Sequence, residues 1–585
     1  MEKNTAWAIG LSTVVLVGFF FVQSYLMPKP ENVQTNQTTV VTQETSTTDK
    51  ETEEVQKSLI ESEVSTVQEE QFVLETEKVK VIFTNRGGDI VSYELKNHSD
   101  SETKQFIQMA ENISDKNRAF SVSLGNSNAQ IVDDIFNSKR IDNNTIGFYK
   151  KFFVNNEDGT KGEFTLVKTY YFKDSDDVFK LEINVDPGEN FKGLNIDNVG
   201  YTIRTSPQIG PAFDPKIDRY ENRQFISFNG KKKKKVILGN NQTKSFDKEW
   251  NWVAMAGKYF EILTLPENKE NMENKVFYSS KSDLEGKNNG QITMSRKPIG
   301  SNGTKDSYYI YVGPRNEKDL RVYNVPENNN WKLDGVRFDN STQSSGILSW
   351  LEVVLKFLME MINKGVKNWG VSIIILTVLL KLAMFPITAK TAKSTAKMQE
   401  MQPKMQALQE KYKDNPAKLN EQTAKLYKEI GYNPLSGCLP MLFQFVILFA
   451  MYNLFNNYFE FRGACFIPGW ISDLSKGDSV KTLGFDIPFL GNQIRLLPII
   501  YVLSQIFFSK ITQNGGTATG QNNGQMKFMM YGLPIIFFFM FYNAPSGLLL
   551  YWTISNLIQL VQQLVINSSM AKAKQTSAKV KLIKK

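Results

Sequence analysis

Long apolar stretches constrain the fold of this 585-residue chain more strongly than any other feature of its sequence. Residues 6–27 are 22 consecutive positions without a charge, and a helix of that length, at ~1.5 Å per residue, crosses a hydrocarbon core of ~30 Å. Five further apolar stretches follow at 369–389, 434–458, 494–510, 527–543 and 547–567. The chain is therefore predicted to be a polytopic α-helical membrane protein with six transmembrane helices.

The N-terminal region has two possible interpretations. Residues 1–27 could be an uncleaved transmembrane anchor or a cleaved signal peptide. The anchor is favoured, because the apolar stretch exceeds the usual ~7–15 residues of a signal-peptide core and no small-residue cleavage site follows it. Residues 28–70 are rich in Thr, Glu and Gln and contain no aromatic residue. A segment of this composition buries too little surface to offset its ordering entropy, which predicts a disordered tether.

Residues 71–340 show the alternation of apolar and polar residues that is typical of strands. In one run Phe179, Leu181, Ile183 and Val185 alternate with polar residues, which predicts a half-buried strand. Similar runs (VKVIF, SYYIYV) lie between turn sequences such as NRGGD at 85–89. These patterns predict an all-β domain, an antiparallel sandwich with few helices. The lysine run 231–235 lies in this domain and is predicted to be a solvated loop rather than a nucleic-acid patch.

Two amphipathic segments flank the second apolar stretch. In 347–366, charges of alternating sign recur every fourth residue beside a row of leucines, which predicts a helix with one charged stripe and one apolar face. Such a helix suits the membrane interface, although it could also pack on a soluble core. Residues 390–432 carry apolar residues at helical spacing on both sides of a DNP break at 414–416, which predicts a helical hairpin. Three methionines on its first helix suit either packing within the hairpin or a plastic surface for apolar partners.

Basic residues beside the spans predict the orientation of the chain. The segment between the second and third spans holds nine lysines against five acidic residues, and residues 568–585 hold six lysines and no acidic residue. Both segments are predicted to be cytoplasmic. The β domain and the loop 459–493 then lie outside, in the periplasm, and both termini lie inside.

Lys381 is the most unusual residue of the spans, because it lies inside a predicted transmembrane helix. A charge at the centre of a span costs ~2.5–3.5 kcal/mol, so an intramembrane lysine is a candidate functional residue. The cytoplasmic boundary lies ~13 Å away along the helix, which disfavours simple snorkelling to the interface. The six spans contain no Asp or Glu, so the expected partner is water or a transient group. Polar residues of other spans could line a wet cavity with it: Gln444, Ser504, Gln505, Trp552, Asn556, Gln559 and Gln563.

The residues needed for catalysis or metal binding are scarce. The chain has one histidine, His98, and two cysteines, Cys438 and Cys465. The predicted topology places the two cysteines on opposite sides of the membrane, too far apart to bridge. No catalytic residue, metal ligand or cofactor is therefore predicted.

Four motifs in order resemble the YidC branch of the Oxa family of membrane protein insertases, over essentially the whole chain. They are NWGVSIIILTVLLKLAMFPIT, MQPKMQALQEKY followed by NPLSGCLPMLFQ, WISDLS, and APSGLLLYWTISNLIQLVQQ. The resemblance implies a hydrophilic groove, open to the cytoplasm, in which a basic residue attracts the polar segment of a client protein. Lys381 occupies the position of that residue, which is usually arginine, so the charge is kept without bidentate binding to a carboxylate. Trp552 matches a groove aromatic of some relatives.

The resemblance also implies the partners and the location. Nascent membrane proteins are the expected clients, the Sec translocon and membrane lipids are expected partners, and the ribosome is expected to meet the cytoplasmic hairpin and the basic tail. Members with a large β domain lie in the cell inner membrane of Gram-negative-type envelopes. Two other functions stay open from the residues alone: a secondary transporter of an anionic solute, and a periplasmic carbohydrate-active enzyme anchored by its spans. A transporter of that kind tends to show duplicated halves in its sequence. A carbohydrate-active enzyme needs a positioned acid and base.

Overall fold

The computed structural model describes residues 60–583, apart from 101–102, 111–116, 157, 212–220, 240, 281–289, 344–347, 414, 431–433, 489 and 514–530. These residues divide into a β-rich unit that ends at Gln343 and a helical unit that follows it. Each unit is described by itself. The predicted anchor, residues 1–27, and the part of the predicted tether before residue 60 lie outside the described residues.

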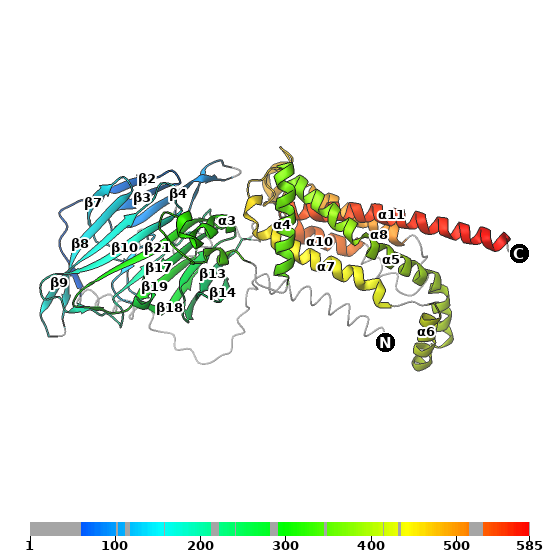
Figure 1. The fold of residues 1–585 in the computed structure, drawn as a ribbon, viewed down its shortest axis with the longest axis horizontal. Coiled ribbons are helices and arrows are strands. Elements are labelled where there is room, and N and C mark those ends of the chain that lie inside the picture. The colour runs from blue at the N-terminus through cyan, green and yellow to red at the C-terminus, as the bar shows by residue number, and fades with distance from the viewer. Residues whose placement is uncertain are drawn as a thin grey trace. The chain divides into compact units, whose positions relative to one another are not determined.

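The β-rich unit is built on a ten-stranded sheet (Figure 1). Its strands follow the order β1 (Ile60–Ser62), β8 (Thr145–Asn155), β9 (Lys161–Tyr171), β10 (Val178–Pro187), β21 (Thr304–Pro314), β17 (Phe260–Pro266), β16 (Trp252–Ala256), β13 (Arg223–Phe228) and β14 (Lys233–Leu238), and β7 (Asn137–Asp142) also pairs with β8. Each of these pairings is antiparallel.

Smaller antiparallel sheets accompany the large one. A four-stranded sheet has the order β2 (Gln71–Glu75), β3 (Val79–Thr84), β4 (Asp89–Ser99) and β5 (Phe106–Gln108). A five-stranded sheet has the order β15 (Thr243–Asp247), β18 (Met272–Ser279), β19 (Gln291–Arg296), β12 (Tyr201–Arg204) and β6 (Val122–Ser123), and β11 (Gly193–Leu194) pairs with β20 (Ile299–Gly300). Aromatic contacts join the four-stranded and the five-stranded sheet to the ten-stranded sheet. Phe83 of β3 contacts Tyr170 of β9 at 4.9 Å, and Tyr278 of β18 contacts Phe225 of β13 at 4.1 Å, both between ring centroids. The prediction of a β-rich domain is confirmed.

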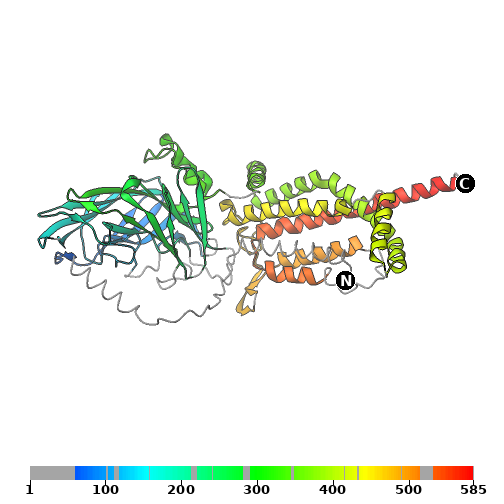
Figure 2. The ribbon, with the colours of Figure 1, turned by 90° about the horizontal axis from the view of Figure 1, so that it is seen from below.

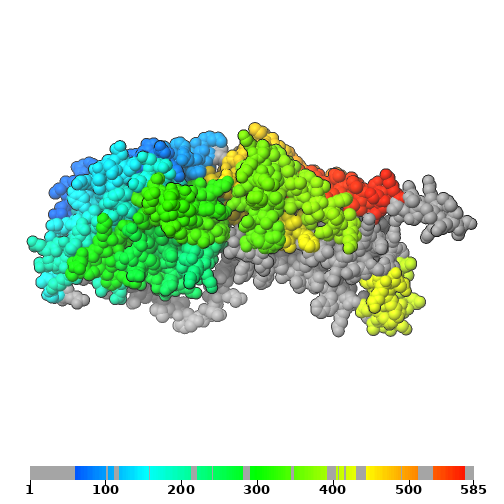
Figure 3. All heavy atoms as spheres, viewed as in Figure 1, coloured from blue at the N-terminus to red at the C-terminus, as the bar shows by residue number. Residues whose placement is uncertain are grey.

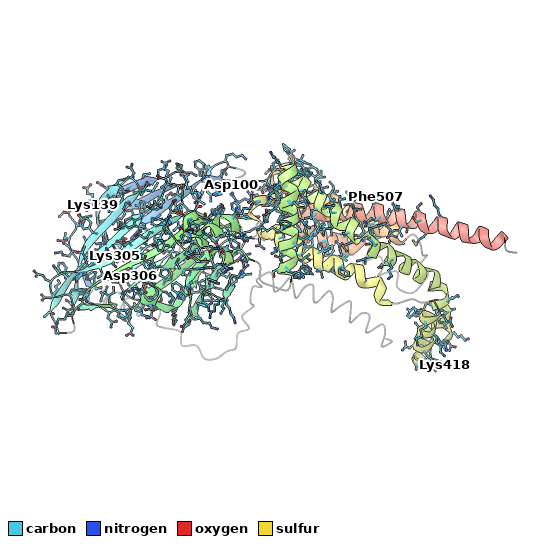
Figure 4. The ribbon with its side chains drawn as sticks, viewed as in Figure 1. Asp100, Lys139, Lys305, Asp306, Lys418 and Phe507 are labelled. Carbon is cyan, nitrogen blue, oxygen red and sulfur yellow. The ribbon has the colours of Figure 1, made fainter. Side chains whose placement is uncertain are left out.

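The alternation read from residues 179–185 matches strand β10. Its four apolar side chains are fully buried, as expected for one face of a pleated strand. Glu182, on the other face, is also buried, and its carboxylate pairs with Lys305 of β21 at 3.0 Å. Lys305 is labelled in Figure 4. The NRGGD turn joins β3 to β4, and Gly87 and Gly88 adopt φ values of 68° and 63° that suit glycine.

Short helical segments accompany the strands of this unit. They are the short helices η1 (Lys269–Asn271), α3 (Glu317–Arg321), η3 (Val322–Asn324), η4 (Pro326–Asn328) and η5 (Phe338–Ser341). Tyr323 and Phe338 pack into one buried cluster with Trp252 and Tyr311 of the sheet. The segment that ends the β-rich unit is therefore part of its core.

Two sequence predictions in this unit are wrong. The composition of residues 60–70 predicts a disordered tether, yet β1 pairs with β8, and Glu69 forms an ion pair with Arg86 at 2.6 Å. The lysine run 231–235 is predicted to be a loop, yet Lys233 begins β14, which pairs with β13. In each case hydrogen bonds to another strand order a polar segment that its own composition does not stabilise: the distant β8 pairs with β1, and the preceding strand β13 pairs with β14. Lysines are common on such edge strands because they discourage pairing with another chain.

The helical unit contains α4 (Ser349–Val366), α5 (Trp369–Lys411), α6 (Pro416–Ile430), α7 (Pro434–Asn457), η6 (Phe459–Phe461), α8 (Leu497–Gln513), α10 (Leu533–Phe541) and α11 (Ser546–Ile583). The strands β22 (Lys481–Ile487) and β23 (Gly491–Ile494) form a hairpin between α7 and α8. Figures 1 and 2 show α5, α7, α8, α10 and α11 running alongside one another, with α4 across them.

Two helical segments among the described residues are long and apolar enough to cross a membrane, Trp369–Thr391 and Ser546–Lys572, and a shorter apolar helix covers Leu497–Ile511. The predicted total of six spans stays a prediction. The predicted break of the cytoplasmic segment lies between the end of α5 and the start of α6. An antiparallel hairpin stays a prediction as well.

Helix α4 turns its charged stripe toward the other helices. Asn453 of α7 donates a hydrogen bond to Glu352 at 3.0 Å, and Tyr458 donates one to Glu360 at 2.9 Å. The outward face is apolar, and the exposed fractions of its side chains lie between 46% and 66% for Trp350, Val353, Val354, Phe357 and Met361. The space-filling view places α4 at the surface of the helical unit (Figure 3). Leu355 and Met359 are buried beside Glu352, so α4 carries apolar side chains both toward the other helices and outward.

Candidate functional site

Lys381 lies where three helices meet. It projects from α5, and its side chain is 7% exposed. Its Nζ donates to Oε1 of Gln444 on α7 and to Oε1 of Gln559 on α11, each at 3.1 Å. Both acceptors are neutral amide oxygens, so neither bond cancels the positive charge of the ammonium group.

The partners of Lys381 differ from the sequence expectation. The sequence predicts water or a transient group, whereas the structure supplies two side-chain amides from other helices. The helical spacing of Gln559 and Asn556 places them on the same helix face, and this spacing was the sequence signal that Gln559 could lie near Lys381. It gave no means of choosing Gln559 over Gln563, whose Nε2 instead donates to Asn567 at 2.9 Å.

Gln562 was missed by the sequence analysis. Its side chain is buried, and its Nε2 donates to the backbone carbonyl of Lys381 at 3.0 Å. A contact from a side chain to the backbone of another helix leaves no pattern in the sequence. Helix α11 therefore contacts residue 381 twice, at the ammonium through Gln559 and at the backbone through Gln562.

The other predicted site residues form a second polar group between α8 and α11. Asn556 donates to Oγ of Ser504 at 3.4 Å, and Gln505 donates to the hydroxyl of Tyr501 at 3.2 Å. The Trp552 ring is buried between Tyr501, at 5.8 Å, and Phe541 of α10, at 4.6 Å. Tyr501 thus joins Gln505 and Trp552.

The six predicted residues therefore separate into two groups that share one helix. Lys381 and Gln444 contact directly, and so do Ser504 and Asn556. Helix α11 carries members of both groups, with Trp552 and Asn556 toward α8 and Gln559 and Gln562 toward α5. The indole Nε1 of Trp552 is buried and has no hydrogen-bond partner among the described residues.

The side of α8 opposite Ser504 faces outward and is apolar. Leu503 and Phe507 are 50% and 57% exposed, whereas Ser504 is 5% exposed. Phe507 is labelled in Figure 4. Helix α8 thus has an apolar outer face and a polar inner face within a single turn.

A separate polar cluster, centred on Asp478 and missed by the sequence analysis, joins the α7–α8 loop to the neighbouring elements. The Oδ2 of Asp478 accepts hydrogen bonds from Trp470 Nε1 at 2.8 Å and from the backbone N–H groups of Leu496 at 2.7 Å and Leu497 at 3.0 Å. Because α8 begins at Leu497, this carboxylate caps the helix from a distant loop.

Arg495 extends the same cluster to the connection between α10 and α11. Its guanidinium donates to the Asp478 carbonyl and to Asn543 Oδ1, each at 3.0 Å, and its backbone N–H donates to the Tyr542 hydroxyl at 3.1 Å. An acid in a loop before an arginine at the start of a span was the only sequence signal for this cluster.

These features define a class: an integral membrane protein with a β-rich domain and a helical unit in which a buried cation is held by uncharged amides. Two family models match the chain. The one described as 60Kd inner membrane protein matches residues 361–574, and the YidC periplasmic domain matches residues 71–339.

Curated relatives give the particular family. The chain is 44% identical over 586 residues to the membrane protein insertase YidC of Treponema denticola, covering 98% of this chain and 100% of that protein. It is 38% identical over 626 residues to the membrane protein insertase YidC of Treponema pallidum, with the same coverage of 98% and 100%. The chain belongs to the YidC family of membrane protein insertases.

A solved structure, described as an active YidC insertase with its first transmembrane domain resolved, covers 86% of this chain and 93% of its own length at 17% identity and a TM-score of 0.32. A likeness at that score supports no conclusion of its own. Membership of the family rests on the sequence comparisons. They confirm the resemblance drawn from the motifs, and with it the function of inserting membrane proteins at the bacterial inner membrane. They give no support to an anion transporter.

Proposed function

We propose that Lys381, Gln444, Ser504, Gln505, Trp552 and Asn556 line a hydrophilic groove that opens to the cytoplasm and receives the polar segment of a client protein. One observation carries this proposal: the buried ammonium of Lys381 has two neutral acceptors, and its positive charge is not cancelled by them. A cation held in this way attracts an acidic or strongly polar segment more than the surrounding lipid does.

The groove lowers the cost of moving a polar segment across the bilayer. Burying a polar group without a hydrogen-bond partner costs ~2–7 kcal/mol, depending on the reference state. Amide, hydroxyl and ammonium groups along the path supply such partners in turn. Burial of the client's own apolar helix in lipid then drives the transfer forward. No covalent chemistry is involved.

The topology belongs to the same proposal. Six spans, with residues 1–27 as an anchor and the β-rich domain in the periplasm, place both termini in the cytoplasm. Helix α4 lies in the outer interface, which its exposed apolar face and inward charges support. The cytoplasmic segment 390–432 and the basic tail 568–585 meet ribosomes, the spans meet lipids, and the protein works alone or beside the Sec translocon.

Site-specific crosslinking tests the groove. A photoreactive amino acid placed at Ser504 faces inward, and the same amino acid at Phe507, less than one turn away, faces outward. The expected result is that a stalled client forms adducts through its polar segment at position 504 and not at position 507. Equal adducts from the two positions, in protein that still inserts its client, would contradict a groove on this face.

A further inference from the structure

The two glutamines that hold Lys381 suggest how the groove acquires a preference among clients. A lysine ammonium has three N–H donors and no acceptor. Gln444 and Gln559 accept from it at 3.1 Å each. Two donors are thereby committed to protein amides, and no other side chain that the structure describes accepts from the third.

The amides also fix where the charge lies. A lysine side chain has four flexible carbons and can move its ammonium toward water at the interface. Gln444 on α7 and Gln559 on α11 hold the ammonium from two sides, and Gln562 holds the backbone of the same residue. The position of the charge is therefore set by three side chains from two neighbouring helices.

The chemical type of the acceptors matters as much as their position. A carboxylate at either position would pair with Lys381 and leave a neutral site. An amide accepts a hydrogen bond without supplying a negative charge, so the net charge of the cluster stays positive. Within the described part of the helical unit, a client carboxylate therefore finds a cation with no acidic partner and one N–H not used by the two amides.

We infer that Gln559 and Gln444 are positioning residues that keep Lys381 uncompensated, and that they make the groove selective for client segments carrying carboxylates. This inference rests on the proposed function of Lys381. It goes further by assigning the selectivity to two residues that act only through the lysine.

The test uses full-length protein in membrane vesicles and two clients that differ only in their translocated segment, one with aspartates and one with asparagines. Gln559→Glu adds a permanent counter-charge beside Lys381. Insertion of the aspartate client is expected to fall about fivefold, the scale of a partly screened ion pair, while the asparagine client is unchanged. Gln563→Glu is the matched control, because Gln563 is on the same helix and contacts Asn567 instead.

A charge relocation separates positioning from a structural role. In Lys381→Gln combined with Gln559→Lys, the lysine and the amide exchange helices, so the cluster keeps its charge and its hydrogen-bonding groups. This variant is expected to insert the aspartate client at least threefold better than Lys381→Gln alone, which a merely structural role of Gln559 would not produce.

The outcomes distinguish the two levels of the argument. If Lys381→Ala leaves the aspartate client unaffected, the proposed role of Lys381 is wrong. If Lys381→Ala lowers its insertion but Gln559→Glu acts no more strongly than Gln563→Glu, the lysine role stands and the inference about Gln559 is overturned. Insertion of the asparagine client, measured in the same vesicles, corrects for altered abundance or folding.

Discussion

Removing the Asp478 carboxylate should destabilise the helical unit. This side chain is 1% exposed, and its Oδ2 accepts three hydrogen bonds, from an indole and from two backbone N–H groups at the start of α8. Asp478→Ala would leave all three donors without this acceptor, and the N–H of Leu497 is buried while the other two donors are half-buried. Each such donor costs ~1–3 kcal/mol. Because the three share one acceptor and the loop can relax, we expect a total of about 4 kcal/mol rather than the full sum.

Asp478→Asn tests the role of the charge. The amide keeps one acceptor oxygen in place but supplies no negative charge to the helix N-terminus, so the expected cost is about 1–2 kcal/mol. Asp486 lies in the same loop, on β22, and is exposed. Asp486→Ala is therefore the matched control, and it should leave stability within about 0.5 kcal/mol of the parent.

The measurement is thermal unfolding of the purified protein in detergent, followed as the fraction that stays monodisperse after heating. At about 2–4 °C per kcal/mol, the midpoint should fall by roughly 10 °C for Asp478→Ala and by about half as much or less for Asp478→Asn. Midpoints for both Asp478 variants equal to that of Asp486→Ala would refute the reasoning, because they would mean that the three donors find other partners at no cost.

Four other perturbations have defined outcomes. Lys381→Arg should keep insertion of an acidic client, whereas Lys381→Ala should reduce it and Lys381→Glu should reduce it most, in the paired-client assay at matched protein levels. Lys168→Met should cost the β-rich unit about 1–3 kcal/mol in denaturant unfolding, because buried Asp89 would lose one charged hydrogen-bond partner and keep the other, Arg118. Deleting residues 572–585 should reduce ribosome recovery by sedimentation at low salt, and high salt should remove the difference. The exposed thiol of Cys465 should react with a membrane-impermeant maleimide in cells with a permeabilised outer membrane, and protection until the inner membrane is opened would overturn the proposed topology.

The elements that the sequence predicted well are those in which a local pattern decides the structure. The alternation at residues 179–185 predicts the fully buried apolar face of β10, although the structure also buries or half-buries the polar face. The apolar stretch 369–389, in which Lys381 is the single charge, likewise predicts a helix, and this stretch lies in α5. Both depend on the spacing of apolar residues along one segment.

Contacts between distant segments were the part that could not be predicted. Residues 60–62 have the composition of a tether, and only the unpaired edge of β8 makes them a strand. Gln559, Gln562 and Gln563 are indistinguishable in type, and the rotation of α11 about its axis decides which one meets the ammonium, the backbone or Asn567. The Asp478 cap joins a loop to a helix that begins 19 residues later, through backbone groups that carry no sequence signal.

The two buried polar clusters of the helical unit are built around charges of opposite sign. At Asp478 one carboxylate oxygen meets three donors, and Arg495 adds contacts to the next connection, so this cluster fastens loops to helix ends. At Lys381 the acceptors are neutral, and the charge is positioned without being neutralised. A charged group that only stabilised the helical bundle would gain from a carboxylate partner, because a paired ion avoids much of the cost of burial. The amides at Lys381 forgo that gain, which supports the proposal that the cluster serves client recognition.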